Sequence, residues 1–252
     1  MGGRVTALSA AELRSAKGHR RLAVLTAYDY PMALALDAVG LDVILVGDSL
    51  GEVELGYDST RAVSLAMMEH HVRAVAHGAT NTHITGDLPA DTYTTPAQAV
   101  ASSRALVAAG AHSVKLEGAL IAQVAAIIAD GIPVMGHVGL LPQTAEGGYH
   151  TQGRTQNEAN RIVADAMALD QAGCFAIVIE AVDPAVSTRI TPLVGAPTIG
   201  IAAGTDCDGQ VLVSTDLVGL LPNPPPFVQP KANLHAVIIG AAKSFTDEVR
   251  GV

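Results

Sequence analysis

The 252-residue sequence contains no Trp, only 3% aromatic residues and two cysteines. Cys174 and Cys207 form no CxxC pair, which argues against a disulfide framework and is typical of a reducing compartment. Only 15% of the residues are charged, and the net charge of -9 argues against nucleic acid, because phosphate binding requires clustered Lys and Arg. The N-terminus lacks the apolar core of a signal peptide, and the longest apolar run, ALIAQVAAIIA from Ala119, is too short to span a bilayer. We therefore expect a cytoplasmic protein without a membrane partner.

Hydrophobic residues make up 49% of the chain, so the core must be large and aliphatic. Short β-branched runs alternate with Ala-rich helical stretches, which indicates βα units and a parallel sheet buried on both faces. The runs predict eight strands, at residues 22–29, 42–49, 81–89, 113–118, 132–139, 175–182, 198–204 and 210–214. This pattern predicts an α/β fold, a (β/α)8 TIM barrel, as one domain over residues 1–252.

Helices are predicted between these strands, with start signals at several of them. The expected ranges are 31–39, 64–77, 96–109, 121–129, 156–172, 184–193 and 234–249. Thr155 with Glu158 reads as a capping box, and Ser9 with Glu12 predicts a short N-terminal helix before the first strand. No helix is predicted between the seventh and eighth strands.

Charged side chains stand at the carboxyl ends of the predicted strands, where barrel enzymes place their active sites. Asp48, Asp87 and Glu117 come from three different strands and are hard oxygen donors. Such a set suits Mg²⁺, which takes few protein ligands and keeps positions for substrate and water. Each acid taken singly could equally be a helix cap or a loop hydrogen-bonding group, but acids at successive strand ends together favour a site.

Three further residues complete this candidate site. Lys115 lies two positions before Glu117, so both side chains point to the same side of a strand, and its ammonium group could neutralise a substrate carboxylate. Glu180 stands alone in the apolar run CFAIVIEAV and is the candidate proton-transfer base. His137 at the end of the fifth strand is either a hydrogen-bond donor to substrate or a satisfied structural histidine.

Motifs at these strand ends resemble ketopantoate hydroxymethyltransferase (3-methyl-2-oxobutanoate hydroxymethyltransferase). They read LTAYDYP, LVGDSLG, GYDST, DLP, VKLEG, GHVGLLPQ, GGYHTQGR and AAGTDCDGQVLV. The likeness runs from about residue 21 to about residue 215, and the combination of GDSLG, VKLEG and GGYxxQGR is specific.

This resemblance implies a transferase of pantothenate biosynthesis, with Mg²⁺ or another divalent metal as cofactor and 5,10-methylenetetrahydrofolate as co-substrate. By family pattern, Asp48, Asp87 and Glu117 hold the metal, and Glu180 is the catalytic base that converts 3-methyl-2-oxobutanoate to its enolate on the way to 2-dehydropantoate. Asp48, Ser49, Asp87 and Lys115 are expected at the substrate, and we add His137. The family further implies a homo-oligomer, a decamer of stacked pentamers.

The chain departs from the family pattern in places, and these departures keep alternatives open. Where the family reads DLPFxSY the chain has DLPADTY, and it lacks the usual C-terminal tail. One alternative is a paralogue that acts on a different 2-oxo acid, and another is a metal-dependent aldolase that uses free aldehyde. A third is the related barrel group of phosphoenolpyruvate mutase and isocitrate lyase, whose loop motifs are not found. A non-enzymatic barrel would predict damage to the acidic set, which is intact.

Overall fold

The computed structural model describes residues 6–145 and 148–251, so Gly147 of the GGY motif lies outside the described residues. The chain forms two compact units, residues 1–211 and residues 212–252. The prediction of one domain over the whole chain stays a prediction.

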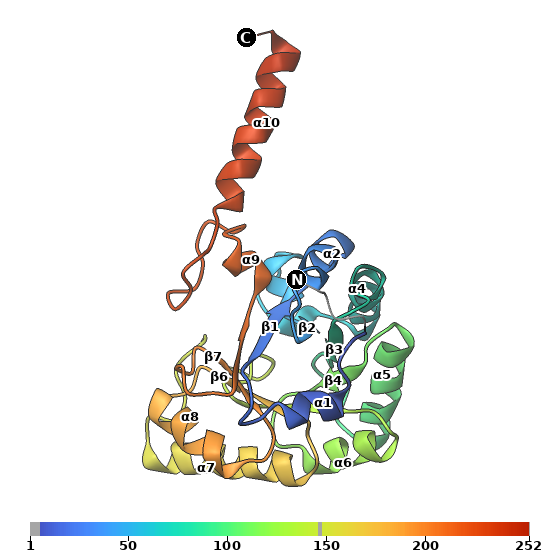
Figure 1. Cartoon of the computed structure of the whole chain (residues 1–252), viewed down its shortest axis with the longest axis vertical. Coiled ribbons are helices and arrows are strands. Elements are labelled where there is room, and N and C mark those ends of the chain that lie inside the picture. The colour runs from blue at the N-terminus through green and yellow to red at the C-terminus, as the bar shows by residue number, and fades with distance from the viewer. Residues whose placement is uncertain (1–5, 146–147, 252) are drawn as a thin grey trace. The chain divides into compact units, whose positions relative to one another are not determined.

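Eight parallel strands close into a barrel in sequence order, which confirms the predicted (β/α)8 fold (Figure 1). They are β1 (Leu22–Thr26), β2 (Val43–Val46), β3 (His83–Asp87), β4 (Ser113–Lys115), β5 (Val134–Gly139), β6 (Ala176–Glu180), β7 (Thr198–Ile201) and β8 (Gly209–Leu212). Each pairs with the next in parallel register, for example Val43 with His83 and His137 with Val178. Apart from β5, which ends at Gly139 as predicted, the strands end earlier than predicted because the residues after them belong to loops.

Helices surround the strands of the first unit, as Figure 1 shows. They are α2 (Tyr30–Asp37), α4 (Leu65–Gly78), α5 (Pro96–Ala108), α6 (Ile121–Ala129), α7 (Gln156–Gln171) and α8 (Pro184–Ile190), the last continued by a 3₁₀ turn, η2 (Thr191–Leu193). Their inner faces place Val72, Leu106, Val124 and Leu169 in one fully buried apolar cluster with the outer faces of the strands. The packing is aliphatic, as a composition without Trp predicts. No helix separates β7 from β8, also as predicted.

Two short helical segments after β2 were not predicted, namely α3 (Leu50–Val53) and η1 (Thr60–Ala62). Each is too short to show an apolar period in the sequence. One cap also differs from the prediction. The Thr155 hydroxyl accepts from the backbone N–H of Glu158, but the Glu158 carboxylate accepts from the backbone of Arg154, so the box is only half formed.

The second unit contains α9 (Ser214–Leu217) and α10 (Leu234–Arg250). Asn233 caps the N-terminus of α10 by accepting from the backbone N–H of Ala236, and Gly251 ends the helix with a left-handed φ of 70°. This bears out the predicted helix at 234–249, whereas α9 was not predicted. No helix in the part of the chain that the structure describes is long and apolar enough to cross a membrane.

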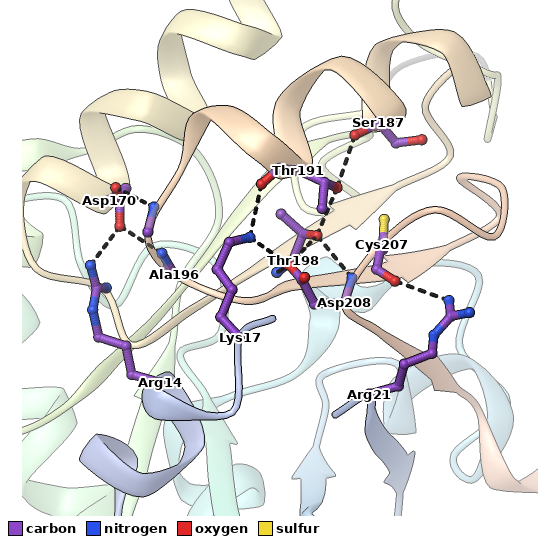
Figure 2. Close-up of polar contacts among 11 residues, drawn as sticks. Arg14, Lys17, Arg21, Asp170, Ser187, Thr191, Ala196, Thr198, Cys207 and Asp208 are labelled. Carbon is purple, nitrogen blue, oxygen red and sulfur yellow. Dashed lines mark hydrogen bonds and ion pairs between the residues drawn. The ribbon is translucent and has the colours of Figure 1, made fainter. Parts of the chain in front are cut away.

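The N-terminal helix α1 (Ala10–Ser15) and the segment after it cover the amino ends of the strands. The predicted capping box of Ser9 and Glu12 is complete. Figure 2 shows Arg14 paired with Asp170, 2.7 Å apart, and Lys17 paired with Asp208, 2.6 Å apart. These pairs join the start of the chain to segments that precede β6 and β8, so the base of the barrel is held by long-range polar contacts.

Candidate active site

The residues predicted as a site lie at the opposite end, where the carboxyl ends of the strands meet. Asp48 and Ser49 follow β2, Asp87 ends β3, Lys115 ends β4, Glu117 follows two residues later, His137 lies in β5 and Glu180 ends β6. Asp48, Asp87, Lys115, Glu117 and His137 are each at most 4% exposed. Ser49 is half-buried, and its hydroxyl lies 2.8 Å from that of Tyr28.

The Lys115 ammonium group supplies the positive charge of this cluster. Its Nζ lies 2.7 Å from Asp87 Oδ2 and donates to His137 Nδ1 at 3.4 Å. The backbone N–H of Asp48 also donates to Asp87 Oδ2, at 3.5 Å. The structure therefore brings together side chains from β2, β3, β4 and β5 that are far apart in the sequence.

The buried carboxylates outnumber the one ammonium group, and their ionisation reflects this. Burial raises the pKa of Asp87 to about 8, although Lys115 opposes the rise. Burial also raises the pKa of Glu117 to about 9, and the charges of Asp48 and Asp87 add to the effect. Burial alone would lower the pKa of Lys115, but the neighbouring carboxylates raise it overall. A further positive charge at this position would relieve the repulsion among the acids.

His137 connects the lysine to the predicted base. Burial and the Lys115 charge lower the pKa of His137, so its ring is neutral near pH 7. Because an ammonium group can only donate, Nδ1 accepts from Lys115 and the proton resides on Nε2. Nε2 faces Glu180, with 3.3 Å between Nε2 and Oε2. The Glu180 side chain is 22% exposed. Unlike the other acids, it is therefore open to solvent at the mouth of the barrel, the end at which the carboxyl ends of the strands meet.

The acids are suited to a metal by their chemistry, but their side chains do not already form a cage. Within residues 6–145 and 148–251, no group of three His, Cys, Asp or Glu side chains is arranged to hold a metal ion. However, Asp87 Oδ1 and Glu117 Oε1 are buried without a hydrogen-bond partner. Buried carboxylate oxygens without partners are costly, and a hard divalent cation would satisfy both.

Sequence reasoning missed two uncharged residues of the site, Gln143 and Tyr93. Gln143 is buried in the loop after β5 and contacts both Asp48 and Glu117. The Tyr93 hydroxyl donates to Gln143 Oε1. Both residues lie within motifs noted in the sequence, GHVGLLPQ and DLPADTY, but neither carries a charge that would have marked it as part of a site.

A cleft of about 240 Å³ opens beside the cluster. Tyr93 and Gln143 form part of its wall, together with Arg61 and with Ala90, which stands where the family pattern has Phe. This departure therefore lies next to the site, where it can affect what binds beside the acids.

Backbone strain is also found at this end of the barrel. Gly139 has a φ of 98°, and a Cβ added there would lie 2.3 Å from the carbonyl oxygen of Glu180. Ala181 and Ala202, which follow β6 and β7, have positive φ values of 46° and 49°. Such conformations cost energy in non-glycine residues and cluster at functional sites.

A closed parallel barrel with buried acids, a lysine and strained loops at the carboxyl ends of its strands defines the class of (β/α)8-barrel enzymes. The family within that class follows from sequence comparison. The model of the ketopantoate hydroxymethyltransferase family matches residues 7–252, and the chain belongs to this family.

Curated relatives agree with this assignment. The chain is 48% identical to the 3-methyl-2-oxobutanoate hydroxymethyltransferase of Oleidesulfovibrio alaskensis, over 97% of this chain and 87% of that protein. It is 47% identical to the enzyme of the same name from Ignicoccus hospitalis, over 94% of this chain and 92% of that protein. The predicted resemblance is thus confirmed, as is the prediction of an enzyme of the transferase type.

Solved structures share the fold at low sequence identity. A phosphonopyruvate hydrolase has a TM-score of 0.66 at 15% identity and covers 96% of this chain and 87% of its own. A 2,3-dimethylmalate lyase of the PEP mutase/isocitrate lyase superfamily has a TM-score of 0.61 at 15% identity, over 97% of this chain and 89% of its own. These similarities bear on the fold alone.

Proposed function

We propose that this chain transfers a one-carbon unit to the enolate of a branched 2-oxo acid, converting 3-methyl-2-oxobutanoate to 2-dehydropantoate. The family and the names of the relatives favour this reaction. The observation that carries the proposal in the structure is the buried cluster of acids around Lys115, with the more exposed Glu180 at its edge.

Substrate binding is assigned to the donors of the cluster. The Lys115 ammonium group takes the carboxylate of the oxo acid, because it is the cation at the centre of the site. The Ser49 hydroxyl and the Nε2–H of His137 are further donors at the mouth. Asp87, which pairs with Lys115, and Asp48, whose backbone N–H donates to Asp87, are assigned places beside the substrate.

Glu180 is assigned as the base. It removes the proton from the α-carbon of the oxo acid, the C–H bond breaks, and the electron pair moves to the keto oxygen to form the enolate. Water releases the one-carbon unit from methylenetetrahydrofolate as formaldehyde, which breaks its two C–N bonds and leaves tetrahydrofolate. The enolate carbon then attacks the carbonyl carbon, the C=O electron pair moves to the oxygen, and that oxygen takes the proton from Glu180 to give the hydroxymethyl group. His137 is assigned to keep the Glu180 carboxylate in place, because its Nε2 lies 3.3 Å from Glu180 Oε2.

Asp48, Asp87 and Glu117 are the residues that would hold Mg²⁺ or another divalent cation, and two of them have a buried oxygen without a partner. When bound, such a cation supplies a Lewis acid that stabilises negative charge on the keto oxygen. We assign the donor of the carbon as 5,10-methylenetetrahydrofolate. The cleft at Tyr93 and Arg61 lies beside the site and is open to a second substrate.

The decamer and the cytoplasmic location are parts of the same proposal. The location is supported by Cys174 and Cys207, which are both free and buried, as is typical of proteins from reducing compartments. The decamer rests on family resemblance.

The reaction is tested by incubating the chain with Mg²⁺, methylenetetrahydrofolate and a panel of 2-oxo acids, with the products identified by mass. We expect 3-methyl-2-oxobutanoate to give the hydroxymethylated acid. Turnover with free formaldehyde alone would favour the aldolase, and a preference for another oxo acid would favour a paralogue.

The role of Glu180 as the catalytic base is tested separately, by exchange of the α-proton of the oxo acid for deuterium. Glu180→Gln should abolish exchange while the binding of Mg²⁺, measured by calorimetry, survives. Glu69→Gln on the outer helix α4 is the control and should exchange like the wild type. Undiminished exchange in Glu180→Gln would remove Glu180 from the mechanism.

A further inference from the structure

Gln143 is held in a tight turn directly after β5. The backbone N–H of Thr144 donates to the carbonyl of Leu141 at 3.0 Å, so Pro142 and Gln143 are the two central residues of the turn. The proline fixes the backbone before Gln143, and the N–H of Gln143 is not used within the turn. That N–H donates to Glu117 Oε2 at 3.1 Å.

The side-chain amide of Gln143 can adopt only one orientation. Its Nε2 lies 2.9 Å from the carbonyl oxygen of Leu88, which can only accept, so this atom must be the nitrogen. The second N–H of the same group donates to Asp48 Oδ2 at 2.7 Å. Oε1 is left to accept from Tyr93, whose hydroxyl therefore cannot donate elsewhere.

These bonds use both amide hydrogens, the amide oxygen and the backbone N–H of a residue that is 2% exposed. One oxygen of Asp48 and one oxygen of Glu117 are thereby held from the same side. Glu117 Oε1, the oxygen that Gln143 does not contact, has no partner.

We propose that Gln143, fixed by Tyr93, is a positioning residue that orients the carboxylates of Asp48 and Glu117 for a divalent cation and substrate. The inference rests on the proposed function and deepens it. Gln143 needs no contact with the reacting atoms, because it acts through the two carboxylates. Residues that orient ligand carboxylates in this way contribute about 10–100-fold to metal affinity or activity.

The central variant is Gln143→Met, which has a similar volume but no donors. Its matched control is Gln171→Met, because Gln171 is exposed at the end of α7 and does not line the cleft. The affinity for Mg²⁺ and for Mn²⁺ is measured by calorimetry, with kcat, KM and the melting temperature recorded alongside. We expect Gln143→Met to lose about 10–100-fold in cation affinity and in kcat/KM, and Gln171→Met to match the wild type.

Tyr93→Phe is the second variant, because it keeps the packing and removes only the hydroxyl. We expect it to weaken cation binding by several-fold, less than Gln143→Met, since the amide keeps both of its donors. Its melting temperature should stay close to that of the wild type. This variant tests the proposal even if Gln143→Met folds poorly.

A merely structural role for Gln143 predicts a lower melting temperature with unchanged cation affinity and kcat/KM in the folded variants, and that result would overturn the proposal. A wild type that turns over without binding either cation would also overturn this inference, because the carboxylates would then hold no cation. A wild type without turnover would overturn the proposed function and this inference together. A wild type with turnover that Gln143→Met and Tyr93→Phe both match would overturn this inference only.

Discussion

The two ends of the barrel differ in whether their buried charges have partners. At the base, Asp170 accepts from Arg14 and from the backbone N–H groups of Gly195 and Ala196, each at 2.7–2.8 Å. Burial raises the pKa of Asp170, but these bonds outweigh it and lower the pKa overall. At the mouth, burial raises the pKa of Asp87 and Glu117 to about 8 and about 9, and each keeps an oxygen without a partner.

This contrast distinguishes the charged residues that stabilise the fold from the charged residues that are left to bind a ligand. A buried charge at the base of the barrel destabilises the folded state unless it has a partner. A binding site, in contrast, must keep charge and hydrogen-bonding groups free for its ligand. The mouth also carries the strained residues Ala181 and Ala202. We therefore expect substitutions at the base to cost stability and substitutions at the mouth to cost function.

The largest effect on stability is expected for Asp170→Ala. It leaves two backbone N–H groups and the Arg14 guanidinium without their acceptor, which should lower the free energy of unfolding by about 3 kcal/mol. Urea unfolding measures this loss. Asp165→Ala on the same helix is the control, because burial raises the pKa of Asp165 and none of these bonds involves it. Equal stability of the two variants would contradict the role assigned to Asp170 in stabilising the base of the barrel.

A pH-dependent loss of stability is expected from His83 at the base. Its Nδ1–H donates to the carbonyl of Leu8, its Nε2 accepts from Ser113, and burial lowers its pKa to about 4. The folded chain holds this ring neutral, so its contribution to stability is fully present above the unfolded pKa of about 6.5. The contribution is lost as pH falls towards 4, and the loss amounts to about 2 kcal/mol at pH 5.

The measurement is urea unfolding of the wild type and of His83→Gln at pH 7.5 and at pH 5. Gln keeps a donor and an acceptor but does not titrate in this range. The wild type should lose more stability than His83→Gln between the two pH values. The same loss in both would assign the effect to other groups.

A smaller effect of opposite sign is expected for Glu117→Gln at the mouth. In the metal-free chain the raised pKa of Glu117 means that the folded state binds more protons than the unfolded state between about pH 4.5 and 9, so stability falls as pH rises through this window. Removing the charge should therefore raise the free energy of unfolding at pH 8, in EDTA, by about 1 kcal/mol. Catalysis should be lost in the same variant. A destabilised but active variant would reverse the contrast between the two ends.

The smallest effect is expected from relieving strain at the mouth. Ala202→Gly should raise the free energy of unfolding by about 0.5 kcal/mol, because glycine adopts a positive φ without steric cost. Ala38→Gly, at a helix end with an ordinary φ of -72°, is the control and should be neutral or destabilising. Thermal unfolding of both variants measures the difference, and a more stable Ala38→Gly would refute the assignment of strain.

The fold could be predicted well because its pattern is local. Alternating apolar runs and Ala-rich stretches identified all eight strands, and cap residues such as Ser9 and Thr155 marked where helices begin. The charged site residues could also be found, because strand ends converge in a barrel and charges stand out against an aliphatic background. Their roles as metal ligands and base remain predictions.

Other features could not be predicted because they depend on which distant side chains meet. No local pattern marks Gln143 as the contact of Asp48 and Glu117, since these residues lie on different loops. Nor does the sequence indicate that Lys115 pairs with Asp87 more closely than with Glu117, its neighbour two residues away. The pairing of Arg14 with Asp170 joins residues that are 156 positions apart.

The sequence by itself determined the barrel, its order of strands and the family, because periodicity, caps and motifs are written in short stretches of residues. Only the tertiary structure decided which charges are satisfied and which are not. The reason is physical: the energy of a buried charge depends on the partners and the solvent around it, and these are set when eight strands from the length of the chain close into one barrel.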